Sequence, residues 1–278
     1  MPTAAILGAG PIGGAIAHTL ADRAAFRSIR LIDGAADIAA GKALDIRQAG
    51  ALGRVDVELH AAADPLDAAG ADVIVLADPV ADPAWDGEAG LALLSRFVRA
   101  GLAGPFVLAA AEHVVLLERA VAEAKVPADR ILGSAGAAIA GAVRALVGLE
   151  ASAAAADVSV AVVGRPPGFS IAWSSAVVAG ALVTERVAPH RLAAIAHGLP
   201  KLWPPGPQAI AAATAGMAEA LATRGRRVHF AMTVGDGDIG RRGAAAMLPC
   251  MLGEGRVLAR AVPSLSPQER TELQNALA

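Results

Sequence analysis

The chain has 278 residues, of which 55% are hydrophobic and 18% are charged, and its formal net charge at pH 7 is −2. This length and composition predict a globular protein with one large domain or two small ones, and they argue against disorder. The near-neutral charge, with no strongly basic face, argues against a nucleic-acid partner. The short basic group Arg224, Arg226 and Arg227 is interpreted as a solvated turn.

The single cysteine, Cys250, lies in the apolar run MLPCML. No disulfide can form within the chain, which is typical of a reducing compartment, and a buried packing role is expected for this thiol. The apolar stretches 131–149 and 171–183 are too interrupted or too short for a membrane span, which needs about 20 strongly apolar residues. With no charged leader or export-type cleavage site, we expect a cytoplasmic protein without a membrane partner.

The first half of the chain alternates apolar, β-rich runs with helical segments. Strands are predicted at residues 3–7, 28–33, 55–60, 71–78, 105–111 and 129–133. Helices are predicted at residues 11–25, 36–49, 91–100 and 114–124. Continuous apolar strands that alternate with helices predict a doubly wound parallel sheet.

The second half has a different pattern, with no repeat and no long linker. A strand is predicted at 158–164, either a strand or a helix at 171–183, helices at 192–199 and 208–222, and strands around turns at 227–237 and 244–255. The last helix, 266–278, begins with a capping box in which Ser266 is the N-cap and Glu269 is at N3. We expect two closely packed domains, residues 1–138 and 139–278.

Residues 8–13 read GAGPIG and lie between the first predicted strand and the first predicted helix. In a dinucleotide-binding turn, the glycines permit a sharp bend, a close approach of the pyrophosphate, and packing of the helix on the strand. The helix N-terminus attracts the phosphates, and Ile12 is the better donor because Pro11 has no N–H. Asp33 ends the second strand, where a carboxylate binds ribose hydroxyls and favours NAD over NADP. The alternative is that the pattern only makes a turn.

Several segments, in this order and spacing, resemble the lactate/malate dehydrogenase family over nearly the whole chain. They are ILGAGPIGG (6–14), LID (31–33), GKALDI (41–46), ADVIVLA (71–77), DRILGSAG (129–136), AAATAGMAEAL (211–221), RVHFAMTVGDG (227–237), LPCMLGEGRV (248–257) and LSPQER (265–270). The resemblance implies an α/β fold, with a Rossmann doubly wound parallel sheet followed by the family's α+β C-terminal domain. It also implies NAD as the cofactor and a homo-oligomer, either a dimer or a tetramer. The predicted cofactor-binding residues are Gly8, Gly10, Ile12, Gly13, Asp33 and Ala77.

Members of this family use an aspartate–histidine pair for proton transfer, an arginine for the substrate carboxylate, a second arginine on a mobile loop, and an asparagine. The resemblance places Ile139 at the aspartate position and Ala142 at the carboxylate-binding position, and Arg144 matches only a later, supporting arginine. We therefore expect the catalytic helix to lack its functional side chains.

The other catalytic positions are also changed. The asparagine position falls at Ala110 or Ala111, and the histidine position falls at Arg165 or Pro166 in the turn GRPPG. The mobile loop, 78–90, contains four acids and no arginine or lysine. The segment 197–208 replaces a longer helical stretch that normally walls the substrate pocket. The sequence thus predicts no catalytic residue and no lactate or malate dehydrogenase activity.

A few polar residues remain as candidates for a replacement site. Arg165 could bind an anion or lie in solvent, and Glu112 with His113 could act as an acid–base pair or simply begin a helix. Asp78 could reach a ribose or cap its own loop. The glycine-rich turn is expected to be a hairpin rather than a metal site, and it is surrounded by Asp236, Asp238, Arg241 and Arg242. No metal is predicted.

Three hypotheses follow. In the first, the protein has lost the family reaction and binds NAD or another nucleotide as a non-catalytic or regulatory protein. In the second, it is an NAD-dependent oxidoreductase acting on a different small molecule, non-carboxylate or cationic, which would suit the acidic loop. In the third, it is a structural subunit, for example a partner of an active paralogue.

Overall fold

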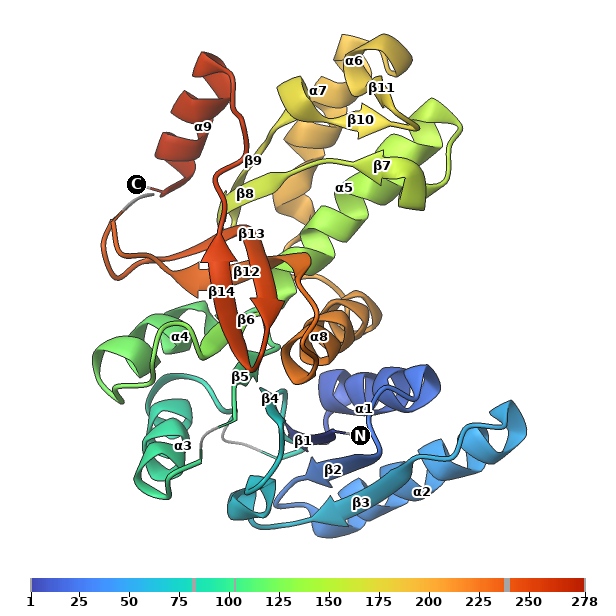
Figure 1. Ribbon diagram of the computed structural model, residues 1–278, viewed down its shortest axis with the longest axis vertical. Coiled ribbons are helices and arrows are strands. Elements are labelled where there is room, and N and C mark those ends of the chain that lie inside the picture. Colours follow the sequence, from blue (N-terminus) through green and yellow to red (C-terminus); the bar gives the residue numbers. More distant parts are fainter. Residues whose placement is uncertain (1, 82–83, 103, 238–240, 278) are drawn as a thin grey trace.

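The computed structural model describes residues 2–81, 84–102, 104–237 and 241–277. A run of parallel strands crosses the lower half of Figure 1 in the order β3-β2-β1-β4-β5-β6. These strands are β1 (Thr3–Leu7), β2 (Ser28–Ile32), β3 (Glu58–Ala62), β4 (Val73–Leu76), β5 (Phe106–Leu108) and β6 (Ile131–Gly133). The order reverses between β1 and β4, as in a Rossmann fold, so the predicted doubly wound sheet is confirmed.

Both faces of these strands are covered by helices. Side chains alternate between the two faces because successive residues of a strand point in opposite directions. Ile6 therefore packs in one apolar cluster and Leu7 in the other. Figure 1 shows α1 and α8 on one side of the strands and α3 and α4 on the other. The helices are α1 (Pro11–Arg23), α2 (Ala36–Gly53) and α8 (Pro207–Ala222) on the first side, and α3 (Gly87–Arg99) and α4 (His113–Ala122) on the second.

Strands from the second half of the chain continue the same sheet beyond β6, now antiparallel. Met232 of β12 pairs with Gly133 of β6, so the two halves share one hydrogen-bonded sheet, with eleven strands in the described part of the chain. The added strands are β8 (Val162–Arg165), β9 (Gly168–Ile171), β12 (Arg227–Val234), β13 (Ala245–Gly253) and β14 (Arg256–Arg260). A small second sheet contains β7 (Val158–Ser159), β10 (Val177–Val178) and β11 (Ala181–Leu182).

The remaining helices come from the second half of the chain. They are α5 (Ala135–Ala151), α6 (Val183–Arg186), α7 (Pro189–Gly198) and α9 (Pro267–Leu277), with short 3-10 turns at Pro65–Ala68, Ala155–Asp157, Trp173–Ser175 and Leu199–Leu202. No helix among the described residues is both long and apolar enough to cross a bilayer. The domain boundary expected between residues 138 and 139 falls inside α5, and the division itself stays a prediction.

Two predicted elements of the second half differ from the structure. The single strand expected at 158–164 is divided into β7 and β8, which belong to different sheets. The segment 171–183 is neither one strand nor one helix, because a 3-10 turn separates β9 from the short β10 and β11. Local apolarity shows that such a segment is buried but does not show where the chain turns.

The capping box of α9 is present, and it also makes tertiary contacts. The Ser266 N–H donates to Glu269 Oε2 at 2.7 Å, and the Glu269 N–H donates to Ser266 Oγ at 3.3 Å. The same carboxylate accepts hydrogen bonds from the backbone N–H and the hydroxyl of Ser174. Glu269 therefore caps α9 and fastens it to the turn after β9.

Candidate functional site

The loop of residues 8–13 joins β1 to α1 and has the sharp bend that its glycines predict. Gly8 has a φ of +103°, a conformation that a side chain would strain. A Cβ on Gly13 would lie 1.9 Å from the carbonyl oxygen of Gly8. The backbone itself therefore requires glycine at both positions, with or without a ligand.

Asp78 accepts the hydrogen bonds of the backbone N–H groups at the end of this loop where α1 begins. Because β1 and β4 are parallel neighbours in register, their carboxyl ends lie side by side, and Asp78 comes two residues after β4. Its carbonyl oxygen accepts the N–H of Gly10 at 2.8 Å. Its carboxylate accepts the N–H of Ile12 on Oδ2 at 3.1 Å and the N–H of Gly13 on Oδ1 at 2.8 Å. Asp78 thus caps α1, which has no capping side chain of its own.

Asp33 makes similar contacts at the strand end of the loop. Its Oδ2 accepts the N–H of Ala9 at 2.8 Å and that of Val80 at 2.9 Å, while Oδ1 accepts the N–H of Ala35 at 2.9 Å. The residue is only 2% exposed. The carboxylate that the sequence assigns to a ribose is therefore buried beneath the segment that follows β4.

Two further residues complete the surroundings of the loop. Ala77 is fully buried, and its N–H donates to the carbonyl oxygen of Leu7 at 2.8 Å. Lys42 of α2 donates from Nζ to the carbonyl oxygens of Ala9 and Gly10. Lys42 was not predicted as a residue of this site, because no feature of the nearby sequence shows that α2 lies against the loop.

These contacts decide how well the loop fits a dinucleotide. A pyrophosphate binds such a loop through amide N–H groups that have no other partner. Between residues 8 and 13 each backbone N–H is already donated, the first of them from Gly8 to the carbonyl oxygen of Ile32. The Asp78 carboxylate also places a negative charge where the phosphates would lie. In this conformation the loop does not fit the pyrophosphate of NAD.

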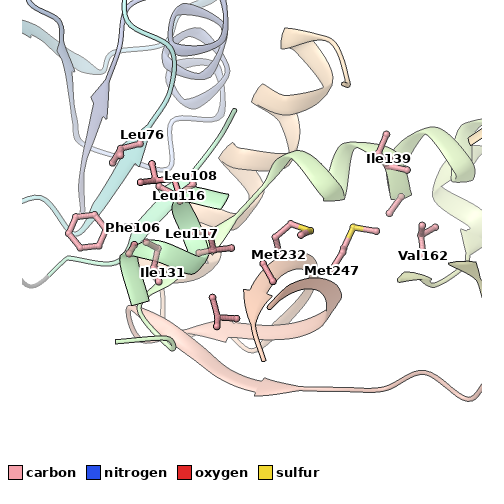
Figure 2. Packing of buried hydrophobic residues seen from close by; sticks show 14 of the residues in the cluster. Leu76, Phe106, Leu108, Leu116, Leu117, Ile131, Ile139, Val162, Met232 and Met247 are labelled. Carbon is pink, nitrogen blue, oxygen red and sulfur yellow. The ribbon is translucent and has the colours of Figure 1, made fainter. Parts of the chain in front are cut away.

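Apolar side chains occupy the expected reaction centre. Ile139 of α5 is 1% exposed and belongs to the same apolar cluster as Met232, Met247 and Val162. Figure 2 shows these side chains together beside α5. Ala142, one turn further along α5, is half-buried and offers only a methyl group, whereas Arg144 is exposed. No proton-transfer group or cation is therefore presented by this part of α5.

Very little space remains beside this cluster. A cavity of about 10 Å³ is lined in part by Ala110, His113, Trp203 and Met232, and this volume holds at most a single water molecule. Trp203 comes from the segment 197–208, where the sequence predicts a shortened pocket wall. The indole ring of Trp203 packs against both apolar clusters of the core.

His113 was a candidate acid–base residue, and the structure buries it. Burial lowers the pKa of the imidazole to about 4, although the Asp86 carboxylate and a hydrogen bond to the Trp85 backbone both raise it. Nδ1 has no hydrogen-bond partner among the described residues. A neutral imidazole with this pKa is a weak base at pH 7. Glu112, its proposed partner, is exposed at the start of α4.

Arg165 is neither a turn residue in solvent nor a free anion site. Its guanidinium forms an ion pair with Glu118 of α4 and donates to the carbonyl oxygen of Ala245 at 3.2 Å. Glu118 also accepts the N–H of Ala245 at 2.7 Å. Both charged side chains are less than one third exposed. The pair therefore joins β8, α4 and β13, and the sequence did not identify Glu118 as the partner.

We expect Glu118→Gln to lower the free energy of unfolding by about 1–3 kcal/mol, because it leaves a half-buried guanidinium without its counter-charge. The matched control is Glu150→Gln, which removes a more exposed ion pair with Arg191, 3.7 Å long, and is expected to cost less than about 0.5 kcal/mol. Urea unfolding measures both. Equal effects of the two substitutions would contradict a structural role for the Arg165 pair.

The remaining candidates are the glycine-rich turn and Cys250. The glycine-rich turn after β12 leads back into β13, so the expected hairpin is confirmed, while Asp238 lies outside the described residues. No group of three metal-ligating side chains occurs in the described part of the chain. Cys250 is fully buried, and burial raises the pKa of its thiol to about 11, which is typical of an inert packing cysteine.

The sequence of the chain is similar to sequences of malate dehydrogenases. No family model matches the chain. A malate dehydrogenase from Thioalkalivibrio sulfidiphilus is 26% identical over 299 residues, covering 100% of this chain and 97% of that protein. A malate dehydrogenase from Caulobacter vibrioides is 46% identical over 72 residues, which is 26% of this chain and 22% of that protein.

Solved structures have the same fold over almost the whole chain. Malate dehydrogenase from Salinibacter ruber has a TM-score of 0.88 at 21% identity, covering 99% of this chain and 93% of its own. Lactate dehydrogenase from Cryptosporidium parvum, complexed with lactic acid and NAD, has a TM-score of 0.87 at 21% identity, covering 99% of this chain and 94% of its own. The chain therefore has the α/β fold of the lactate and malate dehydrogenases. Its sequence is similar to that of a malate dehydrogenase over its whole length.

Proposed function

We propose that this chain is a non-catalytic member of its family that transfers no hydride to or from a 2-hydroxy acid. The observation that carries the proposal is the apolar packing of the reaction centre, where Ile139 is buried and the neighbouring cavity measures about 10 Å³. A 2-oxo acid needs a cation for its carboxylate. Neither Ala142 nor the ion-paired Arg165 supplies one. The protein would therefore act by binding a partner or by supporting an assembly.

The alternative of a different oxidoreductase substrate receives less support. An uncharged or cationic substrate would tolerate the acidic loop, but it would still need a base and space to bind. His113 has a pKa lowered to about 4 by burial, and the cavity beside it has room for at most one water molecule. Self-association and a cytoplasmic location stay predictions alongside the proposed role.

The test is turnover by the purified full-length protein. We expect oxidation of NADH with oxaloacetate or pyruvate, followed at 340 nm, to be at least about 10⁴-fold slower than the roughly 10 s⁻¹ of a typical enzyme. An active malate dehydrogenase assayed alongside provides the positive control. Substrate-dependent oxidation of NADH above that level would overturn the proposal, and turnover on a panel of alcohols and amines would favour the alternative.

A further inference from the structure

The glycine loop is complete as a motif, yet its anion-binding groups are already used within the chain. Ile12 and Gly13 donate their N–H groups to the two oxygens of the Asp78 carboxylate, at 3.1 and 2.8 Å. The helix that begins there has 13 residues and no acid in its first turn, so this carboxylate is the negative charge at its N-terminus. We propose that Asp78 is an internal anion that takes the place of a dinucleotide pyrophosphate and keeps NAD out of the loop.

The missing side chain of Gly10 shows how closely Asp78 sits in the loop. A Cβ on Gly10 would lie 2.4 Å from Asp78 Oδ2, and a Cβ on Gly8 would lie 2.4 Å from the Asp78 carbonyl oxygen. The second glycine of such a motif normally lets a pyrophosphate approach the backbone. Here the same gap admits the Asp78 carboxylate. The glycines are therefore needed for packing, independently of any nucleotide.

The segment that contains Asp78 makes a second contact with the loop region, through Asp33. The N–H of Val80 donates to Asp33 Oδ2, which also accepts the N–H of Ala9, so the segment crosses the loop and covers the carboxylate predicted for the ribose. A dinucleotide would have to displace the Asp78 carboxylate from two amides and also uncover Asp33. The inference does not depend on the loss of the family reaction, because it concerns binding and involves no turnover.

The experiment removes the charge and measures a gain of binding. We expect Asp78→Ala, in the full-length protein, to raise the affinity for NAD and for NADH by about tenfold or more in calorimetric titration, because two amides and the helix dipole become free for phosphate. Asp78→Asn, which keeps the shape of the side chain and removes its charge, should shift the affinity in the same direction. If the Asp78→Ala protein fails to fold, the Asp78→Asn variant still tests the proposal.

The matched control is Asp72→Asn at the opposite end of β4, where the carboxylate accepts the N–H of Thr3 at 2.7 Å. This variant removes the same charge and the same kind of hydrogen bond away from the loop, and its NAD affinity should equal that of the wild type. Equal affinity for NAD in the wild type and both Asp78 variants, whether all bind or none binds, would overturn the proposal. Inorganic pyrophosphate should also bind the Asp78 variants better than the wild type, and failure to do so would contradict competition at the phosphate position.

Discussion

Replacing Ile139 by aspartate is expected to lower the free energy of unfolding by at least about 4 kcal/mol and to restore no dehydrogenase activity. The substitution introduces the residue type that the resemblance to lactate and malate dehydrogenases assigns to this position. Ile139 is, however, 1% exposed and lies among Met232, Met247 and Val162. The variant would lose the burial of a large apolar side chain, worth about 2–3 kcal/mol, and would bury a carboxyl group without a partner.

Two controls on α5 separate this effect from a general sensitivity of the helix. Ile139→Val should cost about 1 kcal/mol, since it removes one methylene from the core. Ala145→Asp introduces the same acid on the exposed side of α5 and should cost less than about 1 kcal/mol, which is mainly helix propensity. Chemical denaturation measures the free energy of unfolding of all three variants. An Ile139→Asp protein as stable as the wild type would show that a polar site survives at position 139.

The second large effect is a loss of stability in acid that depends on His113. Burial lowers the pKa of this imidazole from 6.5 to about 4 in the folded protein. The unfolded chain therefore binds more protons than the folded one between these two values, so protonation favours unfolding. The contribution of His113 to stability is complete above pH 6.5 and is lost as the pH falls toward 4. At pH 4.5 the loss amounts to roughly 2–3 kcal/mol.

The measurement is urea unfolding between pH 7.5 and 4.5 for the wild type and for His113→Leu. The leucine variant keeps the apolar packing and removes the titrating group. The free energy of unfolding of this variant should therefore fall by roughly 2–3 kcal/mol less than that of the wild type over this range. His190→Gln, at an exposed position on α7, should leave the wild-type pH dependence unchanged. Parallel curves for the wild type and His113→Leu would contradict a buried neutral imidazole.

The elements of the first half were predictable because their signals are local. Apolar strands of about five residues separated by helical periodicity specify a sheet covered on both faces, and the structure has that sheet. Boundaries were less well predicted. The strand expected at 55–60 lies at Glu58–Ala62, because α2 continues to Gly53 before the chain turns. Helix ends depend on tertiary packing as much as on the residues at the end.

The sequence also predicts the loss of the catalytic side chains, since a missing side chain needs no coordinates, and this loss stays a prediction. Ile139, Ala142 and Ala110 cannot carry a proton or a charge in any conformation. The side chains that pack around these positions could not be predicted from the sequence. Trp203 and Met232 lie at the expected reaction centre although they come from segments far away in the chain, and the ion pair of Arg165 is with Glu118, 47 residues away.

The sequence by itself determined the resemblance to lactate and malate dehydrogenases and the doubly wound sheet, and it predicted apolar residues at the positions that this resemblance assigns to catalysis. Each of these depends on residue type in a fixed order. Only the tertiary structure decided what the glycine loop binds. GAGPIG specifies a bend and the start of a helix, but it does not specify which acceptors its backbone N–H groups bind. These N–H groups donate to oxygen atoms that the fold brings close to the loop. The parallel pairing of β1 with β4 brings Asp78 to those donors from 65 residues away. A local motif can therefore be intact while its binding groups are already satisfied within the chain.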